Sequence, residues 1–531
     1  MNFLKNRKKE IFLAIVLFFG FIYLFNFVFS YDDISTASGG VQEDFILEYN
    51  AGKNFTLKGF SNLFFLPDYS TDFKKDLQPV FYTHNPPLPS VLQGFLIKIG
   101  FNIFQSRIFY ALISLSGIVF LFLFLSETVS LATAVFSSIF LIINFSGFLS
   151  LADHNQYSLS FPILFGYLWV RYGNIPKKYL IISFLFFTAS FVNYMLAGFM
   201  LITEIFFGIF EKNMRLFFFA LFSVFAGGII HIIQNMVALT PRIAIWDIWL
   251  TVQNRFFSIP SRKELLSFYQ SYNMVLWGSN EQPTSISYIS GAIRPFYLFK
   301  APLFIGGIFT FFFYAFKRGS VYKNRKFIVP LFLAVFIWQA LFFPTIGNHP
   351  LFFHAFLAIF LGMVVGDLFY ELIEKMRFNK DFFNMFLKNT FFKIIILLAV
   401  GIIGWKYFML AGIFSDDERL SDILTMLDNY KGKTFFTNIA PNTVSFKTGA
   451  WSVGFCLPEG LINIDTSNCY SKFSGLSNEK LIPDYILLSS HAFAFKCPHE
   501  CFFDLKNKLI VKYELVEEIN NGEDLIYKVK K

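Results

Sequence analysis

The chain has 531 residues, of which 55 % are hydrophobic and only 15 % are charged. A soluble domain carries roughly 45–50 % apolar and about 25 % charged residues, so this composition excludes a cytosolic globular fold and also disordered or collagen-like chains. The formal charge is +9, and 79 residues are phenylalanine. The composition therefore predicts a polytopic membrane protein with enough polar chain for one soluble domain and two large loops.

Apolar runs long enough to cross a bilayer recur along the chain. A membrane-spanning helix needs about 20 apolar residues and pairs its backbone polar groups within its own segment. The first run, from Ile11 to Ser30, follows four cations and lacks a small-residue cleavage site, so we expect it to remain as a span. With it we expect about eleven spans in an α-helical fold. The other runs lie near residues 107–125, 129–149, 157–170, 179–195, 196–210, 216–236, 301–316, 327–343, 350–370 and 391–411.

The positions of Lys and Arg select one orientation of these spans. With the N-terminus inside, each segment expected on the cytoplasmic side carries cations, including Arg171, Lys177 and Lys178 after the fourth span. The short outer connections 150–156 and 345–349 carry none. This positive-inside pattern predicts an integral, multi-pass protein of the inner membrane, and it accounts for the basic charge without nucleic acid as a partner.

An odd number of spans puts the C-terminus on the outer side, together with the loops at about 31–106 and 237–300. We expect residues 1–411 to form the transmembrane domain and residues 412–531 a small extracytoplasmic α/β domain. Asn521-Gly522 between two apolar runs predicts a β-hairpin in this tail. The strand-like runs are Thr434–Ile439, Tyr485–Ser489 and Leu509–Glu514, and the helical pattern is Asp417–Tyr430.

All four cysteines, Cys456, Cys469, Cys497 and Cys501, lie in this tail. An even number of cysteines confined to a domain outside the cytoplasm is typical of disulfides. The simplest pairing joins Cys456 to Cys469 and Cys497 to Cys501, with crossed pairing as an alternative because the second loop is very short. Buried free thiols are another alternative. A zinc site is not favoured, since Cys497-Pro-His-Glu-Cys501 has no matching second pair nearby.

The first outer loop concentrates acidic residues beside the membrane. Two acids follow the first span directly, and Glu43 and Asp44 come about a dozen residues later. The residues that follow have helical spacing, in which Tyr49 and Gly52 share one stripe while Asp44 and Glu48 lie four apart on another. A helix of this kind along the bilayer surface would direct carboxylates towards the bundle interior. The alternative is that Asp44 only caps or solvates a surface helix.

A proline-rich motif closes this loop, with the sequence Phe81-Tyr82-Thr83-His84-Asn85-Pro86-Pro87-Leu88-Pro89. Adjacent prolines cannot continue a helix but can begin one, because the first N–H groups of a helix have no intrahelical partner. The apolar segment from there to Gly100 is too short to span a bilayer and predicts an interfacial helix under the loop. His84 either binds a ligand or only caps a rigid turn.

Two further polar clusters lie at the outer ends of spans. Asp153 and His154 precede the fourth span, and Asn348, His349 and His354 lie at the mouth of the tenth. Ionisable groups at the boundary of an apolar chain normally face a cavity. The alternative is a polar turn wetted by lipid headgroups. The sequence has no Walker loop, dinucleotide fingerprint or HExxH zinc motif, so nucleotide-driven transport and zinc proteolysis have no support.

The order of these features resembles the multi-span GT-C glycosyltransferases, specifically the protein mannosyltransferase and aminoarabinose transferase group. The resemblance rests on the acidic pair before an aromatic-Ala-Gly helix, the Thr-His-Asn-Pro-Pro-Leu-Pro segment, Arg107 at the start of the second span, Asp153 and the outer C-terminal domain. The family often has a second histidine where this chain has Asn85. The resemblance implies a GT-C-like catalytic domain that moves a sugar from a polyprenyl-phosphate to an acceptor on the outer face, with inversion at the anomeric carbon.

The resemblance also implies roles for particular residues. Asp44 would be the general base that takes the proton of the acceptor hydroxyl, and Glu43 would support it or exchange roles with it. The leaving phosphate needs no general acid, but it needs cationic or N–H donors. No cofactor is required, a divalent metal is not indicated, and the acceptor could be a lipid, a glycan or a protein. The residues expected to bind acceptor or donor are His84, Asp153 and His154. The candidates for the donor phosphate are the cations of the middle outer loop, of which Arg294 and Lys300 lie nearest the next span; the others are Arg242, Arg255 and Arg262.

The main alternative function is a non-enzymatic lipid or polysaccharide transporter, or flippase, that uses the same cavity. A transporter favours charged residues deep within several spans. Few ionisable groups lie within these spans, Glu204 and His231 being the clearest, and the acids gather at the outer boundary. The sequence therefore favours the enzyme. A membrane-anchored sensor would not need eleven spans.

The disulfides can be tested by counting thiols. We expect the unreduced, denatured protein to resist alkylation and the reduced protein to take up label at four cysteines. Each bridge is expected to contribute about 2–4 kcal/mol to the free energy of unfolding of the tail. Mass spectrometry after alkylation makes the comparison, and four labelled thiols without reductant would contradict the pairing.

Overall fold

The structure is a computed structural model. It describes residues 9–22, 41–69, 79, 81, 86–143, 155–252, 327–346, 355–369 except 357, 361 and 368, 418–437, 444, 447–450, 452–454, 483–489, 499–519 and 524–529. Among the described residues up to 411, helical residues occur at 9–22 and within 355–369, and the labelled helices are α2 (Val41–Lys58), α3 (Leu88–Lys98), α4 (Ile103–Thr128), α5 (Leu131–Ile143), α7 (Asn155–Tyr172), α8 (Lys178–Val192), α9 (Tyr194–Glu211), α10 (Arg215–Ala238), α11 (Pro241–Val252) and α14 (Ile328–Ile346).

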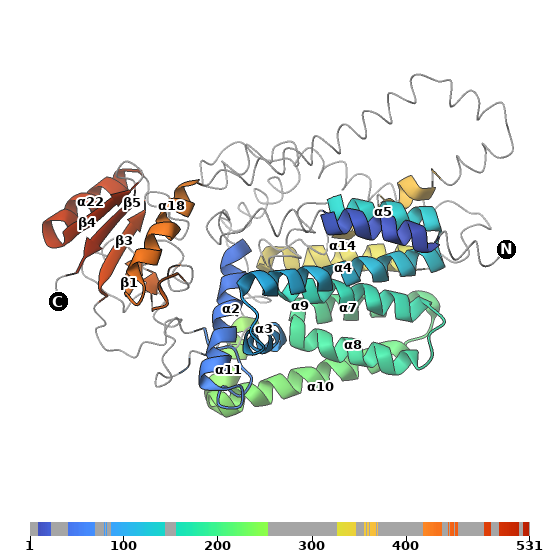
Figure 1. Cartoon of the computed structure of the whole chain (residues 1–531). Helices are drawn as coiled ribbons and strands as arrows, with labels where there is room; N and C mark the ends of the chain where they lie inside the picture. Colours follow the sequence, from blue (N-terminus) through green and yellow to red (C-terminus); the bar gives the residue numbers. More distant parts are fainter. Residues whose placement is uncertain are drawn as a thin grey trace, which may run out of the picture.

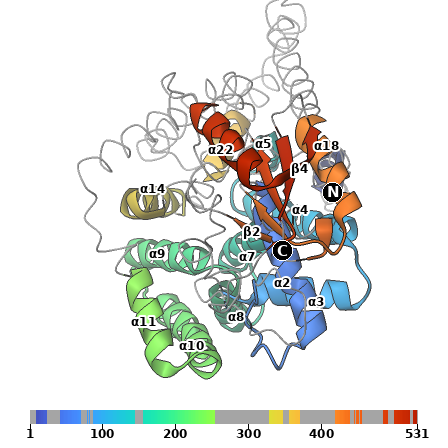
Figure 2. The same ribbon diagram turned by 90° about the vertical axis from the view of Figure 1, so that its left-hand side faces the viewer.

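The long helices lie side by side in a bundle (Figures 1 and 2). Within the described ranges, α4, α9 and α10 are long and apolar enough to cross a membrane, and α5, α8 and α14 contain shorter apolar helices. The fourth expected span is α7, which has 18 residues with Pro162 inside the helix. The runs at 301–316 and 391–411 lie outside the described residues, so the number of eleven spans stays a prediction.

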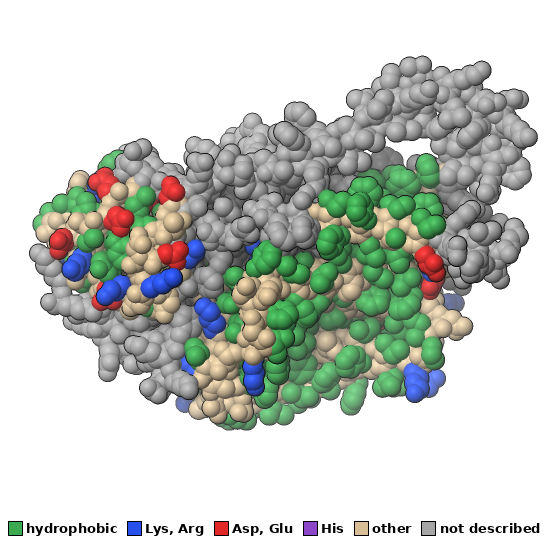
Figure 3. Space-filling view, viewed as in Figure 1, with side chains coloured by type: hydrophobic (Ala, Val, Ile, Leu, Met, Phe, Trp, Pro, Cys, Tyr) green, Lys and Arg blue, Asp and Glu red, His purple; other side chains and the backbone are tan. Residues whose placement is uncertain are grey.

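The bundle is held together by aromatic packing. The fully buried side chains include Phe122, Phe165, Phe186, Phe199 and Phe207. Lipid tails are as apolar as the helix side chains, so in a membrane there is no hydrophobic driving force that brings helices together. Van der Waals packing and hydrogen bonds must hold the helices to one another instead. Hydrophobic side chains also cover most of the described face of the bundle, whereas charged side chains gather on the tail (Figure 3). Both observations fit a bundle surrounded by lipid.

Short polar motifs decide where the helices begin at one end of the bundle. Asn102 caps α4 in a reciprocal capping box, in which its side chain accepts from the Gln105 backbone N–H at 2.8 Å and the Gln105 side chain accepts from the Asn102 N–H at 2.9 Å. α3 begins directly after Pro87 and carries Pro89 in its first turn, as the sequence predicts. These signals confirm the predicted short helix between the outer loop and the second span.

The ends of successive spans meet as the alternating threading predicts. Lys9, at the start of the first helix, forms an ion pair with Glu127, at the end of α4, over 3.1 Å. The indole Nε1 of Trp169, near the end of α7, donates to the same carboxylate at 3.1 Å. α2 and α3 lie across the opposite end of the bundle (Figure 1). The helices therefore alternate in direction, while the side that each end faces stays a prediction.

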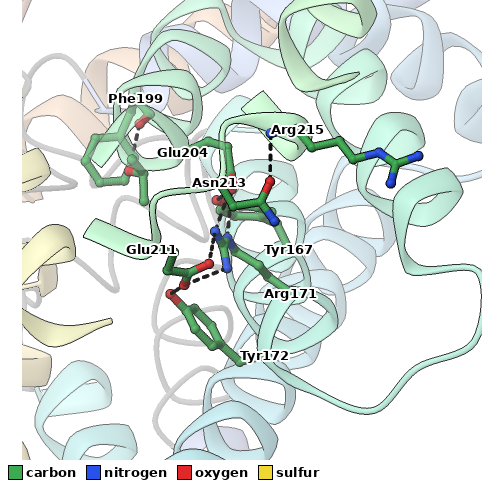
Figure 4. A network of polar contacts seen from close by, with 9 residues as sticks. Tyr167, Arg171, Tyr172, Phe199, Glu204, Glu211, Asn213 and Arg215 are labelled. Atoms are coloured by element: carbon green, nitrogen blue, oxygen red, sulfur yellow. Dashed lines mark hydrogen bonds and ion pairs between the residues drawn. The ribbon is translucent and has the colours of Figure 1, made fainter. Parts of the chain in front are cut away.

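The same end as Lys9 contains a buried ionic network that joins α7 to α9 (Figure 4). Arg171 Nε and Nη2 donate to the two oxygens of Glu204 at 2.8 and 3.1 Å, and Nη1 and Nη2 donate to Glu211 at 3.1 Å each. The hydroxyls of Tyr167 and Tyr172 donate to Glu204 and Glu211 respectively. Arg171 is thus a buried, paired group between two helices, in addition to being one of the cations counted for the positive-inside pattern.

The tail is an α/β domain with a mixed sheet of five strands in the order β2-β1-β3-β5-β4. Strands β2, β1 and β3 are parallel, and β5 and β4 are antiparallel to their neighbours. The views in Figures 1 and 2 agree in placing this domain at the end of the bundle that carries α2 and α3. Its elements are α18 (Glu418–Leu427), the 3₁₀ helix η4 (Asp428–Tyr430), β1 (Phe435–Thr437), β2 (Ser452–Gly454), β3 (Tyr485–Ser489), α22 (His499–Lys512), β4 (Glu514–Ile519) and β5 (Asp524–Lys528).

Two of the sequence patterns in the tail have different outcomes. The antiparallel pairing of β4 with β5 confirms the hairpin, although Asn521-Gly522 lies outside the described residues. The predicted strand Leu509–Glu514 is wrong, because residues up to Lys512 belong to α22 and the strand starts at Glu514. A short apolar run fits a buried helix stripe as well as a strand, and Phe502, Leu505 and Leu509 form such a stripe against the sheet.

The cysteines and the domain boundary are mostly beyond the described residues. Cys501 belongs to α22, and nothing is described of its side chain, while Cys456, Cys469 and Cys497 lie outside the described ranges. The boundary between residues 411 and 412 also lies outside them. The disulfide pairing and the domain limits therefore stay predictions.

Replacing Arg171 with Met should strongly destabilise the bundle. Removing one partner of a buried ion pair leaves an uncompensated charge and costs about 3–5 kcal/mol. The Arg171 side chain is only 4 % exposed, whereas Lys9 and Glu127 are 32 % and 40 % exposed. Lys9→Met is therefore the matched control and should change the free energy of unfolding by less than about 1 kcal/mol. Denaturant unfolding in detergent makes the comparison, and equal effects of the two substitutions would contradict the assignment.

Candidate active site

α2 carries both predicted catalytic acids, Glu43 and Asp44, in its first turn. The helix spans Val41–Lys58, which confirms the helical spacing read from the sequence. The structure describes the backbone of these two residues but not their side chains. Acids in the first turn of a helix are stabilised by the partial positive charge of its N-terminus. The same position therefore suits both the structural role and the catalytic one.

α2 packs against α3 at unusually close range through two glycines. A Cβ atom on Gly52 would lie 2.9 Å from Gln93 Cγ, 3.0 Å from Ile97 Cδ1 and 3.1 Å from the Gln93 carbonyl carbon. A Cβ atom on Gly94 would lie 3.0 Å from Phe55 Cβ and from the ring of Phe60. Only residues without a side chain allow this approach. The stripe that Gly52 shares with Tyr49 therefore faces α3, which places α2 flat on the interfacial helix.

α3 is in turn fastened to the start of α4. The amide Nε2 of Gln93 donates to Ser106 Oγ at 2.9 Å, and both side chains are buried. The hydroxyl of Tyr110 donates to the carbonyl oxygen of Pro89 at 3.2 Å. Tyr49, Leu96 and Tyr110 share a small apolar cluster from the three helices. The middle of α2 is therefore held, through α3, against α4.

Buried ionisable side chains gather where these three helices meet. Glu48 follows Asp44 by one helical turn, is 5 % exposed, and lies close enough to Tyr110 to act electrostatically on its hydroxyl. Arg107, on α4, is 6 % exposed. Burial lowers the pKa of Lys53, whose Nζ lies 5.4 Å from the centre of the Tyr49 ring. An apolar chain that buries charged groups of both signs at one helix junction fits a functional site.

Most of the other predicted site residues lie outside the described residues. They are His84, Asp153, His154, Arg294 and Lys300. For three of them, described residues lie close by in the sequence. His84 lies between Phe81 and Pro86, both described, and Asp153 and His154 directly precede α7. Leu159 in the first turns of α7 packs against the Tyr49–Tyr110 cluster, so the start of α7 lies at the same end of the bundle as α2.

The sequence reasoning missed several polar residues of this region. Glu48 and Gln93 were not assigned roles, and the ion pair between Lys58 and Asp68 was not anticipated. Glu48 had a usable signal, since it lies four residues after Asp44 on the same stripe. The other contacts join residues without a regular spacing and leave no periodic signal. Within the described parts of the chain, no group of three or more His, Cys, Asp or Glu side chains is placed to hold a metal ion.

The comparisons with known proteins agree with this arrangement. Residues 84–234 match the family model described as dolichyl-phosphate-mannose-protein mannosyltransferase. This segment runs from His84 through α3 and α4 into α10. No curated protein gives a significant match to the chain.

Two solved structures share the fold over nearly the whole chain. ArnT from Cupriavidus metallidurans bound to undecaprenyl phosphate is 12 % identical with a TM-score of 0.55, and the match covers 98 % of this chain and 97 % of that one. The Archaeoglobus fulgidus oligosaccharyltransferase tethered to an acceptor peptide containing the NVT sequon is 12 % identical with a TM-score of 0.52, and the match covers 100 % of this chain and 75 % of that one.

The resemblance drawn from the sequence is thereby confirmed: the chain has the fold of the polytopic GT-C membrane enzymes. The match of residues 84–234 to the protein mannosyltransferase family model points to the same class of fold.

The contact between α2 and α3 can be tested with Gly52→Ala. The new Cβ must displace atoms of Gln93, one of them backbone, and overpacking typically costs about 1–3 kcal/mol. Gly228→Ala is the matched control, because Gly228 lies within α10 and a Cβ atom added there would have nothing within 4 Å. Unfolding in detergent should show a loss for Gly52→Ala and little change for the control. A Gly52→Ala protein as stable as wild type would contradict the close approach.

Proposed function

We propose that this chain is an integral membrane glycosyltransferase that moves a sugar from a polyprenyl-phosphate donor to an acceptor hydroxyl at the end of the bundle that carries α2 and α3. One observation carries the proposal. The acidic pair lies in the first turn of a helix packed flat on α3 and α4, in a fold shared with ArnT solved with undecaprenyl phosphate.

Exposed aromatic and aliphatic side chains support a membrane boundary at this end. On α11, Trp246 and Trp249 are 59 % and 51 % exposed, and on α3, Phe95 and Ile99 are 47 % and 69 % exposed. Tryptophan is enriched where hydrocarbon meets water. A polyprenyl chain can remain in the bilayer at such a boundary while its phosphate reaches the aqueous side. The proposal places this end on the extracytoplasmic side of the inner membrane.

The reaction needs one carboxylate as a base and cationic groups for the phosphate. Asp44 accepts the proton of the acceptor hydroxyl as the acceptor oxygen bonds to the anomeric carbon. The bond from that carbon to the phosphate oxygen breaks on the opposite side, so the configuration inverts and polyprenyl phosphate leaves as an anion. Glu43 supports the base. The residues proposed to bind substrates are His84, Asp153 and His154, and those proposed for the phosphate are Arg294 and Lys300.

The buried acids within the bundle support the enzyme over the transporter. Glu204 is paired with Arg171 near the end of α7, where Trp169 contacts Glu127 at the end of α4, whereas α2 contacts α4 near its start at Tyr110. Asp367 accepts a hydrogen bond from the hydroxyl of Thr133 at 3.1 Å. Both acids thus have a structural explanation in contacts between helices. A transport pathway would instead use ionisable groups along a route between the two ends.

The base can be tested with Asp44→Asn in reconstituted vesicles. The amide keeps the shape of the side chain and its hydrogen-bonding capacity but cannot accept the proton. General-base assistance is worth about 10²–10⁴-fold in rate, so sugar transfer from polyprenyl-phosphate sugar should fall by that factor while donor binding survives. Radiolabelled transfer and donor binding are measured on the same preparations.

Two other acids of the same loop serve as controls for this substitution. They are Glu43, next to Asp44, and Asp33, which directly follows the first span. Glu43→Gln should reduce transfer less than Asp44→Asn, and Asp33→Asn should change it little. A dead Asp33→Asn protein beside an active Asp44→Asn protein would move the base to the earlier acid. Full activity of all three variants would exclude the acidic loop as the catalytic centre and would favour the transporter.

A further inference from the structure

The chain that leaves α2 is drawn back onto that helix by a buried ion pair. Lys58 Nζ, in the last turn of α2, lies 2.6 Å from Asp68 Oδ2, and the two side chains are 5 % and 0 % exposed. The amide Nδ2 of Asn54, one turn earlier, donates to the backbone carbonyl of Asp68 at 2.8 Å. α2 therefore holds Asp68 both by its carboxylate and by its main chain.

The turn between Lys58 and Asp68 is strained and tightly supported. Phe64 and Phe65 both adopt the left-handed conformation, with φ of 52° and 57°. Two consecutive non-glycine residues in this region cost free energy and persist only where the surroundings determine them. Support comes from the Phe60 ring, which stacks on Phe55 of α2 at 5.0 Å and on Phe95 of α3 at 4.6 Å, measured between ring centres. The turn thus joins α2 to α3.

Asp68 also connects this turn to the motif that contains His84. It forms an isolated antiparallel β-bridge with Phe81, and the Phe81 ring lies 6.4 Å from that of Phe64, edge to face. His84 follows Phe81 by three residues, and the buried Pro86 and Pro87 that lead into α3 come next. A continuous set of described contacts therefore runs from α2 to both sides of the His84 motif.

We propose that Lys58 and Asp68 are positioning residues for sugar transfer: their buried ion pair holds Asp68, and with it the bridged Phe81, at a fixed place relative to the backbone of the first turn of α2. The role assigned to the pair is placement, and no chemical step is assigned to it. Its effect is to make α2, the strained turn and the start of α3 one rigid unit, in which the backbone of the acidic pair and that of Phe81 keep a constant separation. The inference rests on the proposed function, since it assigns these two sites to one reaction.

Neutral substitutions of the pair separate this role from a general loss of stability. Lys58→Met keeps the length of the side chain without its charge, Asp68→Asn keeps its shape, and Lys58→Arg keeps the charge. Lys508→Met is the matched control, because Lys508 and Asp504 in the tail form the same kind of pair at the same 2.6 Å but are 52 % and 59 % exposed. Two readouts are used, the kinetics of transfer in vesicles and hydrogen–deuterium exchange of peptides containing Asp68 or Phe81.

Lys58→Met and Asp68→Asn should each lower kcat by about 10- to 100-fold, because misplacing catalytic groups by about 1 Å can cost that much. The KM for the donor should change less than kcat. Amide exchange around Asp68 and Phe81 should accelerate in both variants at a temperature where the rest of the chain exchanges as in wild type. Lys58→Arg should recover most of kcat, and Lys508→Met should match wild type in both readouts.

Unchanged exchange around Asp68 and Phe81, or a wild-type kcat in both neutral variants, would overturn the proposal. A loss of protection throughout the bundle, with kcat falling only in proportion to the folded fraction, would also overturn it, because the pair would then be merely structural. A wild-type protein that transfers no sugar would instead refute the proposed function. In that case the hydrogen–deuterium exchange would still show whether the ion pair holds Asp68 and Phe81 in place.

Discussion

The close contact between α2 and α3 is the constraint on which the rest of the candidate site depends. Gly52 and Gly94 let the two helices approach until a single Cβ atom would collide with the neighbouring helix. Gln93 and Tyr110 then transfer that placement to α4. α2 lies across one end of the bundle and is not among the described helices that are long and apolar enough to cross a membrane. Its orientation therefore comes from close packing against α3, which two buried hydrogen bonds fasten to α4.

The two ends of the bundle use buried charge in different ways. At one end Arg171 meets two carboxylates and two tyrosine hydroxyls, so its charge is compensated between helices and the site has a structural role. At the other end Glu48, Lys53 and Arg107 surround the junction of α2, α3 and α4. Burying ions in an apolar bundle is costly unless they are paired or used. The ionic network at the first end joins α7 to α9, whereas the ionic groups at the other end lie where α2, α3 and α4 meet.

The likeness to ArnT and to the archaeal oligosaccharyltransferase joins chains that differ at nearly nine positions in ten. A shared fold at this distance leaves the site and its residues to be argued from each protein. This chain has Asn85 beside His84 in the proline-rich motif. The turn that follows α2 is held by the ion pair between Lys58 and Asp68 and by the stacking of Phe60 on Phe95. The supporting contacts of the site are thus argued from this molecule alone.

The sequence by itself determined the membrane class, the helices α2 and α3, the alternation of span directions and the β-hairpin of the tail, because each follows from local periodicity, proline placement or charge bias. It could not identify the strand limits at Leu509–Glu514, since a short apolar run fits a helix stripe equally well. From the sequence, Arg171 was one of the cations of the positive-inside pattern, and no pattern indicated that Lys58 and Asp68 form an ion pair. Only the tertiary structure showed these ion pairs. A buried ion pair forms when the fold brings two parts of the chain together, and no local sequence pattern indicates which parts will meet.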